Sequence, residues 1–483
     1  DNMEKKGMIT SIDKILKQGI EKFGFEDYIF EKEEGNFKSY TYKEFYEDVL
    51  KFTSFFYAKG LKNKKIALYA ENSYNYMVAD IAIMAYTGIC VSTVQQWKSE
   101  DIKNIINEIG IDAIIYDKSS QVIIDELEAE YKNIEYISFD NLKNLQVQKE
   151  IDLTAVDIEK CSKIVFSSGT TGEPKAVMLS QKNMFANVDN LFRRAAMDSS
   201  DSCYLFLPLS HTYGGIGNFL YSLISGMKIY ICSDKTKIIE EIKEVRPSLF
   251  SAVPLVLNKV YEYAVSTATS IQEILGGNIK YLFCGGAFLE PKIRKYIKDE
   301  GVNLLEAYGL SETTSLISLE YSYDKDDFDS VGTIFENQIV RIDKPDEEGV
   351  GEITVKGDNI FIGYYNREDL YKSVFDVLGY FHTGDIGYVK ENKLYLVGRK
   401  KRVIIKPNAR NIYPEELEAL LLERFDVDAV KIYEKQDKLH CSLYSNRLKY
   451  SKELLEEINF HLPKYAKMDS CEVIKNNLST KLK

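Results

Sequence analysis

The sequence predicts an α/β protein with a large N-terminal domain of stacked parallel-sheet subdomains and a small α+β domain at its C-terminal end. At 483 residues, the chain is too long for one hydrophobic core and should divide into two or more domains. Helix-like and strand-like segments alternate up to about residue 325, which favours parallel sheets with helices on both faces. Short strands and turns predominate from about residue 326 to 397, which predicts a small β-barrel-like unit.

The N-terminal elements are predicted from apolar runs and capping residues. Residues 64–70 (KKIALYA) and 112–117 (DAIIYD) are typical of short buried strands. Residues 72–88 predict a helix that begins with a good cap, and residues 237–254 predict an amphipathic helix followed by a strand. These segments supply the alternation on which the predicted parallel sheets depend.

Two apolar stretches, residues 78–94 and 213–232, superficially resemble membrane spans. Asp80 and a glycine interrupt the first stretch, while Asn218 and Lys228 interrupt the second. Neither contains the roughly 20 consecutive apolar residues that are needed to cross a bilayer. We therefore expect each stretch to form a buried helix followed by a buried strand.

The C-terminal domain is predicted to begin near residue 398, where a basic run leads to a strand, a turn and a helix. Pro414 opens this helix, and acidic residues follow it where the helix dipole favours them. We expect residues 1–397 to form the N-terminal domain and residues 398–483 to form the C-terminal domain.

The composition disfavours several functional classes. A formal charge of −12 argues against binding to nucleic acid or to an anionic membrane. Seven cysteines without a C-x-x-C pair favour a reducing compartment, and the four histidines have no metal-ligand spacing. The charged N-terminus lacks the apolar core of a signal peptide. We expect a cytoplasmic protein without an integral membrane segment.

A loop rich in hydroxyl groups and glycine follows the apolar run KIVFS, at residues 167–175 (SSGTTGEPK). Glycines let the backbone approach a ligand closely, successive N–H groups bind anions, and Lys175 adds a positive charge. The spacing differs from the common G-x-x-x-x-G-K-[ST] nucleotide loop. The stretch therefore indicates either a polyphosphate site or a polar surface hairpin.

Further segments follow in a fixed order and resemble the motifs of the acyl-adenylate-forming superfamily, most closely its bacterial long-chain acyl-CoA synthetases. The resemblance covers nearly the whole chain. It rests on residues 167–180, FLPLSHTYGG at 206–215, LFCGGAFLEP at 282–291, LLEAYGLSETT at 304–314, YFHTGDIG at 380–387 and the segment 398–421.

The resemblance implies that the enzyme attaches a carboxylic acid to the α-phosphate of ATP, releases pyrophosphate, and then transfers the acyl group to a thiol. ATP, Mg²⁺ and CoA would be its cofactors. Glu312 would be the Mg²⁺ carboxylate and would act in catalysis with Lys175. The residues that would hold the departing pyrophosphate are Ser167, Ser168, Gly169, Thr170, Thr171, Gly172 and Lys175.

The resemblance also assigns a nucleotide pocket. Tyr308 would stack on adenine, although a core position is the ordinary alternative for a tyrosine. Asp385 would accept hydrogen bonds from the ribose hydroxyls, and Arg399 would contact the same ribose or the phosphates. The remaining predicted nucleotide-binding residues are Gly285, Gly286, Ala287, Gly309 and Ser311.

Three residues are assigned to the acid and to domain motion. His211 would position the acyl carboxylate without acting as a base, because carboxylates are already ionised at neutral pH. Lys401 would be the hinge between the domains, near residues 398–402. Lys481 would be the catalytic lysine of the C-terminal domain, with Lys475 and Lys483 as alternatives.

The chain departs from the family pattern at a few positions. Ala176 follows the loop lysine where glycine is usual, and Arg402 stands where an acid is frequent. Ala409 adds a methyl group to a position on the pantetheine path that is often glycine, so thiol transfer is less firmly predicted than adenylation.

The resemblance to the bacterial long-chain acyl-CoA synthetases implies that the acid is a fatty acid. The resemblance also implies that an enzyme for amino acids would carry an Asp near the start of the helix from residue 213 onward. Residues 203–227 contain no Asp or Glu, and an unpaired buried ammonium is costly, so a plain organic acid is favoured. Three alternatives stay open: an aryl acid as substrate, the phosphopantetheine of an acyl carrier protein as acceptor, and an adenylate-binding protein without catalysis.

Overall fold

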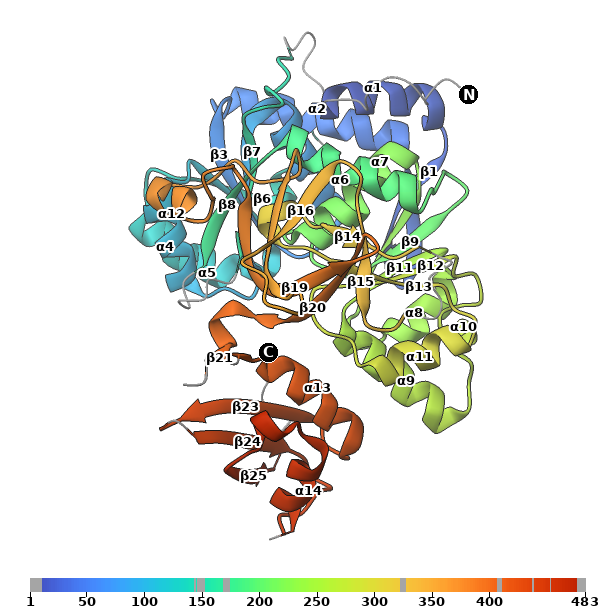
Figure 1. The fold of residues 1–483 in the computed structure, drawn as a ribbon. Coiled ribbons are helices and arrows are strands. Elements are labelled where there is room, and N and C mark those ends of the chain that lie inside the picture. The colour runs from blue at the N-terminus through green and yellow to red at the C-terminus, as the bar shows by residue number, and fades with distance from the viewer. Residues whose placement is uncertain are drawn as a thin grey trace.

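The structure is a computed structural model of the chain. It describes residues 11–142, 145, 153–167, 174–321, 327–405, 411–436, 438–451 and 453–475. A large part contains most of the helices and strands, and a small part formed by the last elements lies beneath it in Figure 1.

The first sheet of the large part has seven strands in the order β18-β8-β7-β4-β3-β5-β6. Neighbouring strands from β7 to β6 run parallel, whereas β8 and β18 are antiparallel to their neighbours. Antiparallel strands thus extend one side of the parallel sheet that the sequence predicted. The strands are β3 (Lys64–Tyr69), β4 (Gly88–Ser92), β5 (Ala113–Tyr116), β6 (Glu135–Ser138), β7 (Cys161–Ser167), β8 (Lys175–Ser180) and β18 (Gly363–Tyr364).

The second sheet has thirteen strands in the order β16-β17-β19-β20-β15-β14-β13-β12-β11-β9-β10-β1-β2. Strands from β1 to β13 run parallel, and from β13 to β16 each neighbour is antiparallel. The predicted β-rich unit therefore extends the edge of an α/β sheet. The parallel half comprises β1 (Asp27–Glu33), β9 (Ser202–Leu205), β10 (Lys228–Ile231), β11 (Leu249–Ala252), β12 (Tyr281–Cys284) and β13 (Leu304–Tyr308), with β2 (Asn36–Thr41) at its edge. The antiparallel half comprises β14 (Ser318–Leu319), β15 (Ser330–Ile334), β16 (Gln338–Asp343), β17 (Gly351–Gly357), β19 (Phe381–Lys390) and β20 (Lys393–Arg399).

Helices fill the space between the sheets and cover their outer faces. Apolar residues of α2, α3 and α6 share one core with strands of both sheets. Helices α4 and α5 pack on the other face of the first sheet, and α8, α9 and α11 pack on the other face of the second. This layering confirms the predicted stacked α/β architecture. The helices are α1 (Ile12–Phe23), α2 (Tyr42–Ala58), α3 (Tyr74–Ala82), α4 (Ser99–Ile109), α5 (Gln121–Glu130), α6 (Gln181–Arg194), α7 (Tyr221–Ser225), α8 (Ile238–Val245), α9 (Pro254–Thr267), α10 (Ile271–Ile274), α11 (Pro291–Asp299) and α12 (Glu368–Ser373).

Both apolar stretches that resemble membrane spans are buried helices followed by strands. The first forms α3 and a π-helical turn before β4, and the second forms a π-helical segment and α7 before β10. Asp80 on α3 is compensated by Lys163, whose Nζ lies 2.6 Å from its carboxylate, with both side chains 1% exposed. Among the helices in the described ranges, none combines the length and apolar character that a bilayer crossing requires.

The small part has its own hydrophobic core, which contains residues from Ile404 to Met468. Strand β20 continues to Arg399, so the regular structure of the large part passes the predicted boundary at 397 by two residues. The elements of the small part are β21 (Ile404–Ile405), β22 (Asn411–Ile412), α13 (Pro414–Arg424), β23 (Ala429–Lys435), β24 (Lys438–Tyr444), α14 (Leu454–His461) and β25 (Ser470–Ile474).

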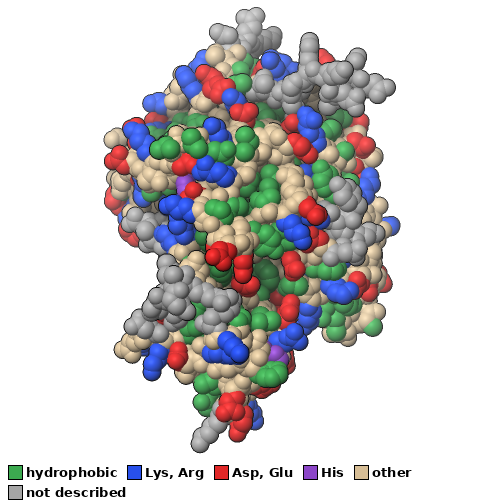
Figure 2. Space-filling model, in the orientation of Figure 1, with side chains coloured by type: hydrophobic (Ala, Val, Ile, Leu, Met, Phe, Trp, Pro, Cys, Tyr) green, Lys and Arg blue, Asp and Glu red, His purple; other side chains and the backbone are tan. Residues whose placement is uncertain are grey.

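Charged side chains of both signs are intermixed on the face of the molecule that Figure 2 shows. Among the coloured side chains of this view, Lys and Arg do not gather into one large area. This distribution agrees with the acidic composition and gives no support to binding of a polyanionic surface on this face.

Candidate active site

The loop predicted to hold phosphates connects two antiparallel strands, β7 and β8. Ser167 ends β7, Lys175 begins β8, and the two residues pair across the hairpin. The two strands thus pair as a hairpin, which is compatible with the predicted phosphate site. Five predicted phosphate ligands lie outside the described residues: Ser168, Gly169, Thr170, Thr171 and Gly172.

Glu312 lies at the base of this hairpin, in a 3-10 turn that spans Ser311–Thr313. The hydroxyl groups of Ser167 and Tyr364 each donate to its Oε1 at 2.9 Å. Lys175 Nζ lies 5.3 Å from the centre of the Tyr364 ring, within the range of a cation–π contact. The structure therefore brings Ser167, Lys175 and Glu312 together.

The group around Glu312 fits a hard divalent cation. Glu312 is 7% exposed, and the two hydroxyl groups that donate to it from the described residues both use Oε1. Carboxylate and hydroxyl oxygens are the donors that Mg²⁺ prefers. A bound Mg²⁺ would offset negative charge on phosphate oxygens.

Tyr364 was not found by sequence reasoning. It reaches Glu312 because β18 pairs with β8, with Tyr364 opposite Val177. The two residues are 52 positions apart in the chain, so no local pattern links them. The residues on either side of Tyr364 are Gly363 and Tyr365, and neither indicates that Tyr364 contacts Glu312.

The predicted adenine shelf is formed at the ends of two adjacent parallel strands. Gly285 and Gly286 follow β12, and Tyr308 ends β13 beside them. A Cβ atom on Gly285 would lie 3.1 Å from the carbonyl oxygen of Ala307, and Gly286 has a φ of +84°. Glycine thus permits both the close approach and the left-handed backbone. Ala287 follows as an exposed residue.

The turn after Tyr308 also requires glycine. A Cβ on Gly309 would lie 2.0 Å from the carbonyl oxygen of Ser315, a distance that no side chain tolerates. Ser311, in the next turn, is buried and positions the backbone before Glu312. The shelf and the Glu312 group are therefore parts of one continuous segment.

Asp385 is joined to Tyr308 by a hydrogen bond and to Arg399 by an ion pair. The Tyr308 hydroxyl donates to Asp385 Oδ2 at 2.6 Å, and Arg399 Nε lies 2.8 Å from Asp385 Oδ1. Burial raises the pKa of Asp385, while the charge of Arg399 opposes that rise. Each oxygen of Asp385 has a further lone pair, so the predicted contact with ribose hydroxyls fits this arrangement.

His211 precedes the buried segment that begins at Tyr213. The backbone N–H of Tyr213 donates to His211 Nδ1 at 3.2 Å, so the ring proton is on Nε2. His211 is exposed at its surface, while the atoms packed around its ring displace part of its water and lower its pKa, which favours the neutral form. A neutral ring with an Nε2–H group suits a donor to a carboxylate oxygen, as the positioning role requires. The contacts found in the described part of the chain do not join His211 to the Glu312 group.

Glu306, one residue before Ala307 on β13, is a second residue that sequence reasoning missed. Burial raises its pKa to about 8, while the charge of Arg294 lowers it and that of Glu320 raises it further. It is 4% exposed and lies near enough to Tyr213 to raise the pKa of that phenol. A neutral carboxyl group is thus buried beside the segment predicted to hold the acid.

The predicted hinge lies between residues held by different parts of the chain. Arg399 is paired with Asp385 of the large part, whereas Arg402 Nη2 lies 2.6 Å from Glu418 Oε1 on α13. Lys401 is between them, in the 3-10 turn Lys400–Arg402. This pairing also explains how Arg402 is accommodated in place of the acid that is frequent there.

The remaining residues singled out in the sequence take no part in the contacts described above. Lys475 is exposed directly after β25. Ala176 is buried in β8 opposite Phe166, where its methyl group is accommodated. Ala409, Lys481 and Lys483 lie outside the described residues.

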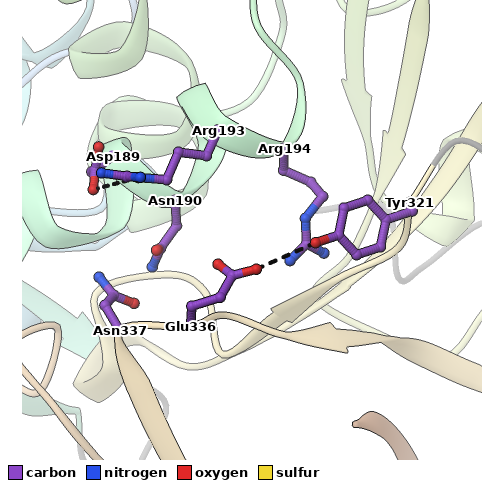
Figure 3. A pocket seen from close by; sticks show the side chains of 7 residues that line it. All are labelled: Asp189, Asn190, Arg193, Arg194, Tyr321, Glu336 and Asn337. Carbon is purple, nitrogen blue, oxygen red and sulfur yellow. Dashed lines mark hydrogen bonds and ion pairs between the residues drawn. The ribbon is translucent and has the colours of Figure 1, made fainter. Parts of the chain in front are cut away.

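A separate polar hollow of about 400 Å³ lies beside the end of α6. Figure 3 shows Arg193 turned to Asp189, and the Tyr321 hydroxyl turned to Glu336. None of its lining residues belongs to the predicted site. Its cations and carboxylates balance, so the lining does not favour a ligand of either charge. The lining residues are Asp189, Asn190, Arg193, Arg194, Tyr321, Glu336 and Asn337.

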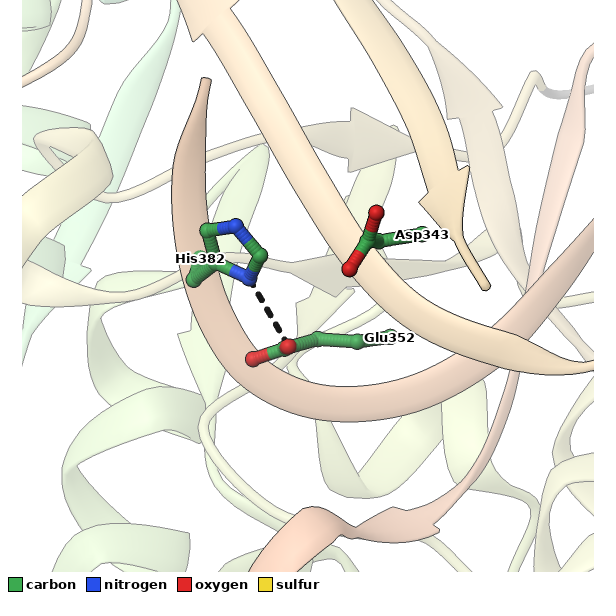
Figure 4. A group of neighbouring side chains, drawn as sticks. All are labelled: Asp343, Glu352 and His382. Carbon is green, nitrogen blue, oxygen red and sulfur yellow. Dashed lines mark hydrogen bonds and ion pairs between the residues drawn. The ribbon is translucent and has the colours of Figure 1, made fainter. Parts of the chain in front are cut away.

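Asp343, Glu352 and His382 form a second cluster, shown in Figure 4, in which one ligand atom from each lies within 4.8 Å of the others. His382 Nδ1 lies 2.8 Å from Glu352 Oε2. Lys400 Nζ lies 2.6 Å from the same oxygen, so an ammonium group already supplies positive charge here. The pairing of β16, β17 and β19 therefore brings one histidine and two carboxylates together, although their spacing in the sequence does not indicate a cluster.

Comparisons with known proteins support the same class. Residues 21–365 match the family described as AMP-binding enzyme. Long chain acyl-CoA synthetase 5 of Arabidopsis thaliana is 24% identical, over 87% of this chain and 75% of that protein. The 2-succinylbenzoate–CoA ligase of Staphylococcus epidermidis is 26% identical, over 88% of this chain and 87% of that protein.

A solved structure has the same fold. The o-succinylbenzoate coenzyme A synthetase (MenE) of Bacillus subtilis, in complex with ATP and magnesium ion, superposes with a TM-score of 0.83. The two chains are 21% identical, and the alignment covers 95% of each.

This chain belongs to the AMP-binding enzyme family, the adenylate-forming class that its motifs predicted. It is an acid–thiol ligase of the type that forms an acyl-adenylate before the thioester. The class of enzyme is thereby confirmed. The predicted cofactors ATP, Mg²⁺ and CoA agree with the ATP and magnesium ion bound by the Bacillus protein and with the CoA ligases among the relatives, while the individual residue roles stay predictions.

Proposed function

We propose that this enzyme activates a fatty acid and transfers it to CoA. Ser167, Lys175 and Glu312 bind the phosphates and Mg²⁺, and Tyr308 with Asp385 holds the nucleoside. The observation that carries the proposal is the convergence on Glu312 of the loop strands β7 and β8 and of β18. It supports a site where cations and hydroxyl groups meet developing phosphate charge.

The choice of a fatty acid depends on the segment that follows His211. Residues Gly214–Leu220 are buried, and residues 203–227 contain no Asp or Glu. The nearby Glu306 has its pKa raised to about 8 by burial and so provides no strong counter-ion at neutral pH. An amino acid would leave its ammonium group without a partner there, at a cost of several kcal/mol. The long-chain acyl-CoA synthetase named above also supports a fatty substrate.

An aryl acid is the second candidate. The Staphylococcus and Bacillus proteins named above are ligases of succinylbenzoate, which is an aryl acid. The acceptor could equally be the phosphopantetheine of a carrier protein, because its thiol is chemically the same. A cytoplasmic location stays a prediction from the sequence.

The function is tested by acid-dependent ATP–pyrophosphate exchange across a panel of fatty, aryl and α-amino acids. We expect exchange with fatty acids of at least one chain length and none with free amino acids. Exchange with an amino acid alone would contradict the inference that the segment after His211 has no counter-ion for an ammonium group. Exchange with succinylbenzoate alone would favour the second candidate. Thioester formation with free CoA and with purified carrier protein then identifies the acceptor.

A further inference from the structure

Gly398 and Glu415 meet across the predicted pivot. Gly398 lies on β20, which pairs with β19 in the second sheet of the large part. Glu415 lies in the first turn of α13, whose Leu417 and Leu421 belong to the core of the small part. Lys401 stands between the two residues in the chain. Their contact therefore depends on the orientation of the small part relative to the large part.

Gly398 leaves the space that the Glu415 side chain occupies. A Cβ atom on Gly398 would lie 2.6 Å from Glu415 Oε2 and 3.1 Å from its Cδ, and the first distance is shorter than packed atoms tolerate. The backbone of Gly398 is not left-handed, so conformation does not require a glycine here. The glycine is instead required by the close approach of α13 to β20.

The Glu415 carboxylate is held in this position. Its Oε1 lies 3.1 Å from Arg402 Nη1, and the backbone N–H of Arg399 donates to the same oxygen over a long distance of 3.4 Å. Its Oε2 is buried, and no group among the described residues donates to it. A methyl group on Gly398 would therefore displace the carboxylate from Arg402 or turn α13 away from β20.

We propose that Gly398 is a positioning residue that provides the seat on which Glu415 docks the small part in its present orientation. The inference rests on the proposed two-step function, in which the small part serves both half-reactions. A rotation at Lys401 carries α13 away from β20 and empties the seat, because the two elements are fixed to different parts. A side chain that fills the seat disfavours the present orientation alone, so it changes the ratio of the two orientations.

The test introduces Gly398→Ala into three backgrounds: the wild type, Glu415→Ala and Glu416→Ala. Glu415→Ala keeps only a Cβ, which lies 3.6 Å from the position of the new methyl group, an ordinary contact. Glu416 is the matched control, because it is exposed on the same helix and helix geometry turns it about 100° from its neighbour.

The three background proteins and their Gly398→Ala versions are assayed for ATP–pyrophosphate exchange and for thioester formation from pre-formed acyl-adenylate. Hydrogen exchange of the amides at 397–401 is measured in parallel, without any substrate. The effect of Gly398→Ala is taken within each background, so the effect of removing a glutamate by itself does not enter the comparison.

In the wild-type background, Gly398→Ala should change the ratio of the two half-reaction rates by about threefold to thirtyfold and accelerate amide exchange at 397–401. One methyl group beside a movable side chain lies at the low end of the usual cost of overpacking, which sets this range. In the Glu415→Ala background, both effects should fall below about twofold. In the Glu416→Ala background, both should keep their full size.

Unchanged amide exchange in Gly398→Ala would overturn the proposal, as would effects of equal size in the wild-type and Glu415→Ala backgrounds. An unchanged ratio in a protein that activates acids would overturn it as well. If Gly398→Ala alone does not fold, recovery of folding in the Glu415→Ala background supports the seat, and failure to recover rejects it. Faster amide exchange that depends on Glu415, in a protein that activates no acid, would support the seat while rejecting the proposed function.

Discussion

Lys175 and Tyr364 illustrate how single residues complete the site. The ammonium group of Lys175 lies over the Tyr364 ring, and the hydroxyl group of the same ring donates to Glu312. One aromatic side chain thus contacts both the cation and the carboxylate that are predicted to bind the phosphates and Mg²⁺.

Lys175→Ala should reduce kcat/KM for ATP by about 10- to 150-fold. A charge-assisted contact to a phosphate contributes roughly 1.5–3 kcal/mol, which corresponds to that range. The measurement is pyrophosphate exchange at varied ATP concentration. Lys182→Ala is the control, because this partly exposed lysine on α6 pairs with Glu159 outside the site. Equal rates for Lys175→Ala and the wild type would show that the loop is wrongly assigned.

Tyr364→Phe should raise the Mg²⁺ concentration that gives half-maximal exchange by about tenfold. The change removes one of the two hydroxyl groups that orient Glu312 but keeps the ring beneath Lys175, and partners that orient a metal ligand typically contribute 10- to 100-fold in affinity. A Mg²⁺ titration of the exchange rate measures this shift. Tyr365→Phe, which loses only a contact with Lys65, should behave as the wild type. If the Mg²⁺ concentration for half-maximal exchange is the same in Tyr364→Phe and the wild type, the assignment of Glu312 as the Mg²⁺ ligand is wrong.

Strand β13 joins the active site to a buried charged network. Glu306 and Tyr308 lie on the same face of the strand, two residues apart. The backbone N–H of Glu306 donates to Glu320, which is paired with Arg294 and Lys298 of α11. The strand that ends at the adenine shelf is therefore held by groups whose charge depends on pH.

The wild type should become less stable as pH rises from 5 to 8 because Glu306 is buried, and Glu306→Gln should abolish this contribution. Burial raises the pKa of Glu306 from 4.5 to about 8, so the folded protein keeps a proton that the unfolded chain releases. Between these values the free energy of unfolding falls as pH rises, by an amount on the order of 5 kcal/mol in total, at about 1.4 kcal/mol for each pKa unit. The variant should therefore gain stability relative to the wild type from pH 5 to pH 8.

Urea unfolding midpoints across this pH range measure the effect, with the exposed Glu300→Gln as the control. A relative stability of Glu306→Gln that is independent of pH would mean that Glu306 is ionised in the folded protein.

The elements with strong local signals were predicted well. Ser73 caps α3 and Pro414 opens α13, and both helices begin where the sequence indicates. The strands after residue 326 were also anticipated, but their attachment to β13 through β14 was not. That attachment depends on backbone pairing between distant segments, for which the side-chain pattern gives no register.

The site shows the same division. Ser167, Glu312 and Tyr308 were found because they stand in motifs whose order is characteristic. Tyr364 and Lys400 were missed as contact residues because each meets its carboxylate only through the pairing of strands far apart in sequence. Local sequence therefore identifies residues that stand in characteristic motifs better than residues that contact them from distant strands.

At the scale of the whole molecule, the two-step reaction requires two arrangements of the chain. One site must first hold ATP and then admit a thiol, and we propose that the part after residue 400 rotates between these steps. The separate core of the small part supports movement as a unit. The anchors on either side of Lys401 support a pivot at this residue.

Lys481→Ala and Lys401→Pro should affect opposite half-reactions. Lys481 would stabilise charge only during adenylation, so its loss should slow pyrophosphate exchange on the order of 10²–10³ and leave thiol attack on pre-formed acyl-adenylate little changed. Lys401→Pro restricts the backbone at the pivot, so adenylate should form while thioester formation stalls. The two half-reactions are measured separately for both variants, with Lys182→Ala as the control. If Lys481→Ala slows both steps equally, or neither of them, Lys481 is not the catalytic lysine, and Lys475→Ala and Lys483→Ala are measured next. Normal thioester formation in Lys401→Pro would reject rotation at this residue.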